Sequence, residues 1–126
     1  MNNKRKVLVI DDEKDFLKIT KLNLEETGRF FVKTLPNAKE LILQVHSFRP
    51  EIILLDLLMP GIGGLEVCDM LNNDAIGKGV PIIILSALEK DTDKLAAYKK
   101  GAVDYLVKPI EKKDLIAKIE KTLRDR

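Results

Sequence analysis

The sequence predicts an α/β fold in which five parallel strands form a doubly wound sheet covered by five helices. Two observations lead to this prediction. Short apolar runs alternate along the chain with segments whose apolar residues recur at helical spacing. In addition, four of the runs are apolar throughout, which is typical of parallel strands buried on both faces: Val7–Ile10, Ile52–Leu55, Ile82–Leu85 and Tyr105–Val107. Strands that alternate with helices in this way imply right-handed crossovers.

The first helix and the strand after it are less regular. Apolar residues at every third position predict the helix, with a face formed by Phe16, Ile19 and Leu22 and with Leu17 and Leu24 beside it. The weaker run Phe30–Val32 predicts the second strand. Because Lys33 and Thr34 follow it directly, we expect this strand at an edge of the sheet.

The four later helices are also predicted from their apolar faces. In chain order these faces are Ala38, Leu41, Ile42 and Val45; Leu65, Cys68 and Leu71; Leu95 and Tyr98, in a short helix that ends near Gly101; and Leu115, Ile116, Ile119 and Leu123. Asn37 followed by Glu40 has the spacing of a capping box, which predicts the start of the second helix.

Composition favours a single soluble domain over residues 1–126. The chain is 45% hydrophobic and 33% charged, which is ordinary for a globule with one core. A net charge of +2 gives no argument for nucleic-acid binding, since the late lysines and arginines alternate with acids. The lone Cys68 cannot form an internal disulfide. The apolar run Val7–Ile10 is too short for a signal peptide or a membrane span, so we expect a cytoplasmic protein.

Polar residues follow the buried strands directly. Asp11 and Asp12 come after the first, Asp56 after the third, Ser86 after the fourth and Lys108 after the fifth. The carboxyl ends of parallel strands lie on one edge of the sheet, where open α/β folds bind ligands. The sequence therefore predicts that three carboxylates, one hydroxyl and one ammonium meet at one edge.

This set of side chains suits phosphoryl transfer. Three carboxylates at close range need a counter-charge, and oxygen ligands suit Mg²⁺. Asp56 is the candidate nucleophile, because carboxylates can form acyl phosphates. Lys108 offers a point charge to a phosphoryl oxygen, and Ser86 offers a hydrogen bond. Such a transfer depends mainly on positioning and charge compensation, which these residues supply without a general base.

Each residue also has an ordinary structural explanation. Asp12 alone is as well explained as the N-cap of the first helix, and Asp56 as a cap on the turn at Met59-Pro60-Gly61. Ser86, Lys108 and Tyr105 are, taken singly, more often structural residues than functional ones. Their occurrence together, each at the same point relative to a strand, favours the functional interpretation.

Five motifs in order extend this interpretation: Val7–Glu13, Leu54–Gly61 with Gly64, Ile84–Ala87, Gly101–Tyr105 and Val107–Pro109. The ordered set resembles the receiver domain of two-component response regulators and covers nearly the whole chain. The resemblance implies a flavodoxin-like sheet of strand order 2-1-3-4-5. It also implies a signalling domain that is not an enzyme in the ordinary sense, since it promotes its own phosphorylation and dephosphorylation.

The resemblance assigns roles to individual residues. It implies that Asp56 is the phosphoryl acceptor and that Asp12, Asp56 and the backbone carbonyl of Leu58 hold Mg²⁺, with Asp11 assisting through a water. It implies that Lys108 contacts the phosphoryl group and that the Lys108–Pro109 bond is cis. Ser86 and Tyr105 resemble the paired switch residues, whose movement repacks the surface of the fourth helix, fifth strand and fifth helix.

The resemblance also implies partners. The phosphoryl donor is expected to be a sensor histidine kinase or a phosphotransfer protein, and the output to be a downstream effector that the sequence does not specify. We expect no membrane contact, no direct nucleic-acid binding by this domain, and either a monomer or a phosphorylation-dependent dimer. The last helix runs to Arg126 without a linker signal, which favours a standalone or truncated receiver.

Three alternatives stay open at this point. A scaffold module of the same fold would never be phosphorylated, a difference that a phosphodonor assay would detect. A nucleotide- or flavin-binding protein needs a loop after the first strand that accepts phosphate, where Asp11 and Asp12 would repel it. An aspartate phosphatase usually has a second acid two residues after the nucleophile, where this chain has Leu58. Leu58 and Leu88 are both apolar, so we expect that neither positions an attacking water and that the acyl phosphate is long-lived.

Overall fold

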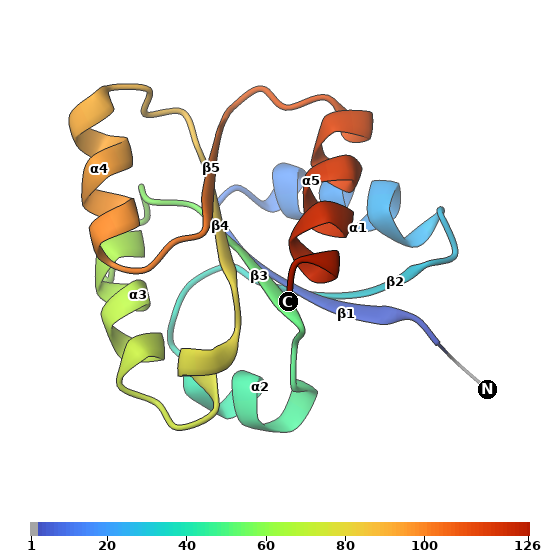
Figure 1. The fold of residues 1–126 in the computed structure, drawn as a ribbon, viewed down its shortest axis with the longest axis horizontal. Helices are drawn as coiled ribbons and strands as arrows, with labels where there is room; N and C mark the ends of the chain where they lie inside the picture. The colour runs from blue at the N-terminus through green and yellow to red at the C-terminus, as the bar shows by residue number, and fades with distance from the viewer. Residues whose placement is uncertain (1–2) are drawn as a thin grey trace.

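The structure is a computed structural model that describes residues 3–126. Strands and helices alternate along the chain, as Figure 1 shows. The elements are β1 (Arg5–Ile10), α1 (Lys14–Glu25), β2 (Phe30–Leu35), α2 (Leu41–Phe48), β3 (Ile52–Leu55), α3 (Gly64–Asn72), the 3₁₀ turn η1 (Gly77–Gly79), β4 (Ile82–Ser86), α4 (Asp91–Lys99), β5 (Asp104–Val107) and α5 (Lys112–Arg124).

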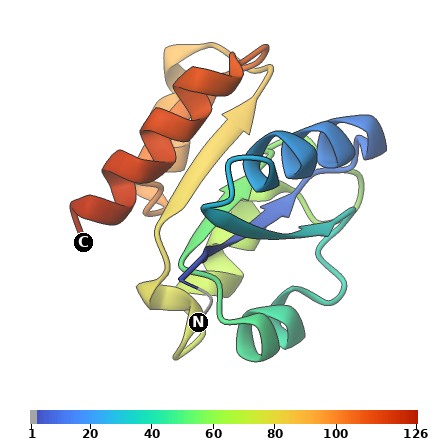
Figure 2. The ribbon, with the colours of Figure 1, turned by 90° about the vertical axis from the view of Figure 1, so that its right-hand side faces the viewer.

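The five strands form one parallel sheet in the order β2-β1-β3-β4-β5. This confirms the predicted fold class and strand order, with β2 at an edge. The order reverses between β1 and β3, so the carboxyl ends of these two strands flank the point where open α/β sheets bind ligands. Figure 2 shows the twist of the sheet and the helices packed against it.

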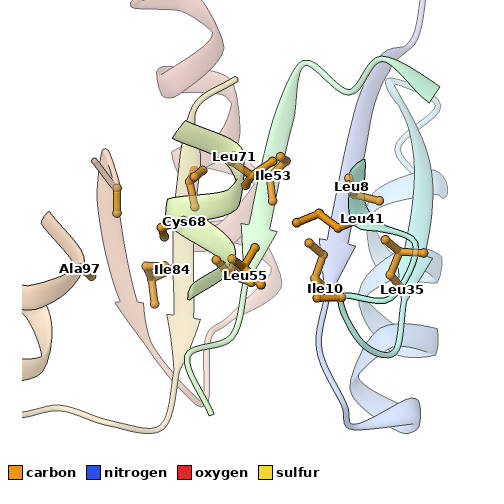
Figure 3. Close-up of a cluster of buried hydrophobic side chains, with 14 of the residues drawn as sticks. Leu8, Ile10, Leu35, Leu41, Ile53, Leu55, Cys68, Leu71, Ile84 and Ala97 are labelled. Carbon is orange, nitrogen blue, oxygen red and sulfur yellow. The ribbon is translucent and has the colours of Figure 1, made fainter. Parts of the chain in front are cut away.

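Two core clusters hold the helices against opposite faces of the sheet. Alternate strand residues point to opposite faces, so Leu8 of β1 packs with α2, α3 and α4 while its neighbour Val7 packs with α1 and α5. Figure 3 shows the first cluster, including Leu8, Ile53, Ile84 and Cys68. Cys68 is fully buried there, as the sequence predicted.

The predicted buried face of α1 is wrong. Ile19 and Leu22 are 56% and 63% exposed, whereas Leu17, Thr20 and Leu24 are the buried residues. A repeat of three falls behind the helical repeat of 3.6, so residues 16 and 22 lie about 120° apart around the axis. A spacing of seven returns to nearly the same direction, which explains why positions 17 and 24 share the buried face.

The expected faces of α4 and the expected start of α2 also need correction. In α4 the small Ala97 is the buried residue, while Leu95 and Tyr98 are exposed. The capping box before α2 does not form: the helix begins at Leu41, and the Asn37 side chain accepts a hydrogen bond from the backbone of Lys39 instead. Residues 36–40 form turns rather than helix, although Ala38 is buried as expected.

Among residues 3–126, no helix combines the length and the apolar character needed to cross a bilayer.

Candidate functional site

Three carboxylates meet at the carboxyl end of the sheet. We call Asp11, Asp12 and Asp56 the acidic rim; one oxygen from each lies within 4.8 Å of the others. The backbone places them: the Asp11 amide donates to the carbonyl of Leu35 (3.1 Å) and the Asp56 amide to that of Ile10 (3.0 Å). Asp11 and Asp56 are buried, at 1% and 5% exposed, while Asp12 is open to solvent.

Lys108 supplies the counter-charge of the acidic rim. Its amide donates to the carbonyl of Ser86 (2.8 Å), which fixes its position just beyond β5. Its side chain is 12% exposed, and its Nζ lies 2.6 Å from Asp11 Oδ2 and 3.8 Å from Asp56 Oδ2. The Lys108–Pro109 bond is cis, as expected. The structure therefore brings together every charged residue that the sequence predicted for this edge.

Burial and charge act against each other on the titrating groups of the site. Burial raises the pKa of Asp56; Lys108 opposes this, and Asp11 and Asp12 add to it. For Lys108, burial acts to lower the pKa, but the hydrogen bond to Asp11 and the charge of Asp56 outweigh it, so the pKa is raised. The Lys108 side chain is therefore a protonated ammonium at neutral pH.

The loop after Asp56 is held by a close approach of α3. Gly64 begins α3, and its amide donates to the carbonyl of Leu57 (3.0 Å). A Cβ at position 64 would lie 2.5 Å from the Asp56 carbonyl oxygen, a distance that a side chain cannot adopt. The Asp56 side chain accepts a hydrogen bond from the amide of Leu58 (3.3 Å), and the Leu58 side chain is exposed. Glycine at position 64 thus allows the start of α3 to pack directly against the backbone of Asp56 and Leu57.

Ser86 and Tyr105 both contact the backbone of Leu88. The Ser86 hydroxyl accepts from the Leu88 amide (3.2 Å), and the Tyr105 hydroxyl donates to the Leu88 carbonyl (2.7 Å). Both side chains are buried, and burial raises the pKa of the Tyr105 hydroxyl. The loop between β4 and α4 is therefore tied to the two residues predicted to act as a switch.

The structure also settles one ordinary alternative and adds two neighbours. Asp12 does not cap α1, because the residue at the N-cap is Glu13. Glu13 Oε1 lies 3.3 Å from the Lys108 Nζ, and the Lys108 ammonium lies over the ring of Phe16. Sequence reasoning missed both contacts. The only signal for Glu13 was its place directly after the two aspartates.

His46 lies apart from these residues. Its Nε2 lies 2.8 Å from Asp74 Oδ1, between α2 and the loop that precedes η1. Asp74 in turn accepts from the amide of Gly77 (2.8 Å). This pair joins two helical segments on the α2 side of the sheet and has a structural explanation.

The donor set at the acidic rim fits a hard divalent cation. It consists of carboxylate oxygens from two strand ends, and Asp12 is open enough to share its coordination with water. Mg²⁺ prefers oxygen ligands and keeps several waters. Asp11, Asp12 and Asp56 are the side chains in reach of one ion.

Comparison with protein families gives one match over most of the chain. The family model described as "Response regulator receiver domain" matches residues 7–120. A probable transcriptional regulator, ycf27, from Guillardia theta is 37% identical over 98% of this chain and 47% of its own length. The DNA-binding response regulator MtrA from Mycobacterium tuberculosis strain H37Rv is 32% identical over 96% of this chain and 51% of its own. The chain thus spans about half the length of these curated relatives.

Solved structures of similar shape cover the whole domain. A two-component response regulator from Clostridium difficile has a TM-score of 0.88 at 30% identity, covering 96% of this chain and 97% of its own. The BeF3-activated receiver domain of DrrB has a TM-score of 0.84 at 26% identity, covering 98% and 99%. The chemotaxis protein CheY4 from Vibrio cholerae, at 24% identity over 94% and 98%, shares the fold with a TM-score of 0.88.

Proposed function

This chain belongs to the response regulator receiver domain family, and from that premise we propose that Asp56 accepts a phosphoryl group from the phosphohistidine of a sensor histidine kinase or a phosphotransfer protein. An Asp56 carboxylate oxygen attacks the phosphorus as the phosphorus–nitrogen bond breaks, and the electron pair of that bond returns to the imidazole. The single observation that carries the proposal is the convergence of three carboxylates and the charged Lys108 at one end of the sheet.

Different residues around Asp56 are proposed to bind Mg²⁺ and to contact the phosphoryl group. Asp11, Asp12, Asp56 and the backbone carbonyl of Leu58 are the proposed Mg²⁺ ligands, Asp11 through a water. When bound, the ion neutralises phosphoryl oxygens and the carboxylates of the acidic rim. Lys108 leaves its contacts with Asp11 for a phosphoryl oxygen, a move that the length of its side chain permits. The domain promotes its own modification and has no ordinary substrate turnover.

We propose that the switch runs through Leu88. When the Ser86 hydroxyl turns toward the phosphoryl group, it releases the Leu88 amide, which it now holds at 3.2 Å. Tyr105 is bonded to the same residue, so the loop and α4 repack together. The surface of α4, β5 and α5 carries the exposed side chains Leu95, Tyr98 and Val103, which supports it as the contact surface for an effector or for phosphorylation-dependent dimers of an otherwise monomeric domain.

The proposal also covers the output of the domain and its cellular compartment. MtrA is a DNA-binding response regulator of about twice this length. We place no nucleic-acid contact on the present domain, whose net charge of +2 comes from intermixed acids and bases. A downstream effector or output domain receives the signal. The buried, unpaired thiol of Cys68 suits a reducing compartment, so we place the protein in the cytoplasm.

The test is phosphorylation by a small donor. The chain is incubated with acetyl phosphate and Mg²⁺ and weighed intact, and we expect one added phosphoryl group. Asp56→Asn should gain none, whereas Asp69→Asn, a matched change in a half-exposed aspartate of α3, should behave as the parent does. In the same samples, chemical shifts of Tyr105 and α4 should move only when Asp56 is modified. A stable acyl phosphate on the asparagine variant would contradict the proposal, and an unmodified parent would favour the scaffold alternative.

A further inference from the structure

The ring of Phe16 lies beside the Lys108 ammonium. The Lys108 Nζ lies 4.0 Å from the centroid of the Phe16 ring, well inside the range of a cation–π contact. Phe16 is partly buried at the start of α1, against the core cluster shared by α1 and α5. The same two side chains line a groove of about 450 Å³ beside the acidic rim. The ring thus has one edge in the core and one face toward the ammonium.

The four neighbours of the ammonium differ in how they hold it. Asp11 and Glu13 lie within hydrogen-bond range of Nζ, at 2.6 and 3.3 Å, and Asp56 lies at 3.8 Å. Each carboxylate attracts the ammonium but also neutralises the charge that a phosphoryl oxygen would need. A ring face attracts a cation through its quadrupole without a full negative charge and without a strong acceptor for an N–H group. Phe16 can therefore hold the ammonium and leave its hydrogen bonds to be exchanged.

We infer that Phe16 is a positioning residue, whose ring keeps the Lys108 ammonium at the acidic rim while its hydrogen bonds pass from Asp11 and Glu13 to the phosphoryl group on Asp56. The inference rests on the proposed function. Phe16 touches neither the donor nor the phosphorus, and it acts only through Lys108. Its effect is to keep the ammonium close to its target and to exclude water from one side of it.

The test compares the rate of Asp56 modification in three variants at saturating Mg²⁺ and increasing acetyl phosphate. Phe16→Leu keeps an apolar side chain but removes the ring, and it should lower the maximal rate by about three- to tenfold, the size of a partly desolvated cation–π contact. Phe16→Tyr keeps the ring and should stay within about twofold of the parent. Phe48→Leu is the matched control, because Lys6 lies 5.7 Å from the centroid of that ring, away from the acidic rim; it should modify at the rate of the parent.

A second measurement needs no phosphorylation. Protons of the Lys108 side chain that lie over a ring face are shifted upfield in the NMR spectrum, and this shift should vanish in Phe16→Leu and persist in Phe16→Tyr. A merely structural role for Phe16 would not make the rate follow the ring in this way.

The possible results distinguish failure of the Phe16 inference from failure of the proposed function. If Phe16→Leu modifies as fast as the parent, or if Phe16→Tyr is as slow as Phe16→Leu, the inference is overturned. An unchanged Lys108 shift in Phe16→Leu overturns it as well, even where the leucine variant is too unstable for kinetics. If the parent gains no phosphoryl group although its Lys108 shift depends on the ring, the proposed function fails and the positioning role fails with it, whereas the contact itself stands.

Discussion

The two ends of the sheet carry charge in different ways. At the carboxyl end, Asp11, Asp56 and Lys108 are nearly removed from water, with Lys108 at 12% exposed. At the opposite end, Arg29, directly before β2, pairs with Glu120 of α5, and the two side chains are 55% and 31% exposed. Both ends therefore hold ion pairs. At the carboxyl end the paired charges are so buried that water cannot replace a lost partner, whereas at the opposite end it can.

The volumes of the clefts at the two ends do not follow the burial of charge. The cleft at the opposite end, lined by Arg29, Phe30 and Glu120 among others, has a volume of about 580 Å³, larger than the groove of about 450 Å³ beside the acidic rim. The ion pairs of Arg29 with Glu120 and of Arg5 with Glu51 are solvated there, and exposed pairs contribute little. The burial of charge, more than the volume of a cleft, therefore distinguishes the end of the sheet that carries the predicted site residues.

The difference between the two ends is tested most directly by removing one cation from each. Lys108→Met leaves Asp11 and Asp56 buried without their counter-charge, so the free energy of unfolding should fall by about 3 kcal/mol. Arg29→Met removes an exposed partner of Glu120 and should cost less than about 1 kcal/mol. Urea unfolding at neutral pH without Mg²⁺ measures both.

The control for this pair is added Mg²⁺. It should reduce the cost of Lys108→Met, because the carboxylates of the acidic rim regain a cation, and should leave Arg29→Met unchanged. Equal costs for the two variants would show that the ends of the sheet do not differ in the way their exposure indicates.

The carboxyl end of the sheet was also the part of the molecule whose structure the sequence predicted best. β3 begins and ends where its apolar run does, and the charged residues after β1, β3 and β5 lie together because parallel topology leaves them no other edge. The rotation of α1 was not predictable, since its apolar residues cover a wide arc. That rotation decides whether the Phe16 ring reaches Lys108, so the cation–π contact could be found only in three dimensions.

A smaller effect concerns the lifetime of the proposed acyl phosphate. We expect Leu58 and Leu88, two residues after Asp56 and Ser86, to flank the path of a water toward Asp56. Their apolar side chains offer no hydrogen bond that would orient this water. Leu58→Asn and Leu88→Glu each introduce a hydrogen-bonding group, so hydrolysis should become roughly tenfold faster. The decay is followed by intact mass after removal of the donor. Leu43→Asn, a change at an exposed leucine of α2, should leave the decay unchanged. Decay that is equal to the parent's or slower, in either Leu58→Asn or Leu88→Glu, would contradict the hypothesis.

The smallest expected effect concerns the buried charge of Asp56. Burial raises the pKa of Asp56 in the folded chain above its ordinary value of 3.8, so at neutral pH its ionised form is less favourable folded than unfolded. Asp56→Asn should therefore raise the free energy of unfolding, by on the order of 1 kcal/mol without Mg²⁺. A raised pKa contributes stability that is fully present below the unfolded value of 3.8 and is lost as pH rises through the folded value. The gain should therefore shrink as pH falls through the folded pKa toward 3.8, and it should vanish only below 3.8, where Asp56 is protonated in both states. Asp69→Asn, which removes the solvated partner of Lys100 on α3, should show no such gain. Urea midpoints from about pH 7 down to about pH 4 measure the difference; a gain that stays constant across this range would mean that relief of buried charge is not its cause.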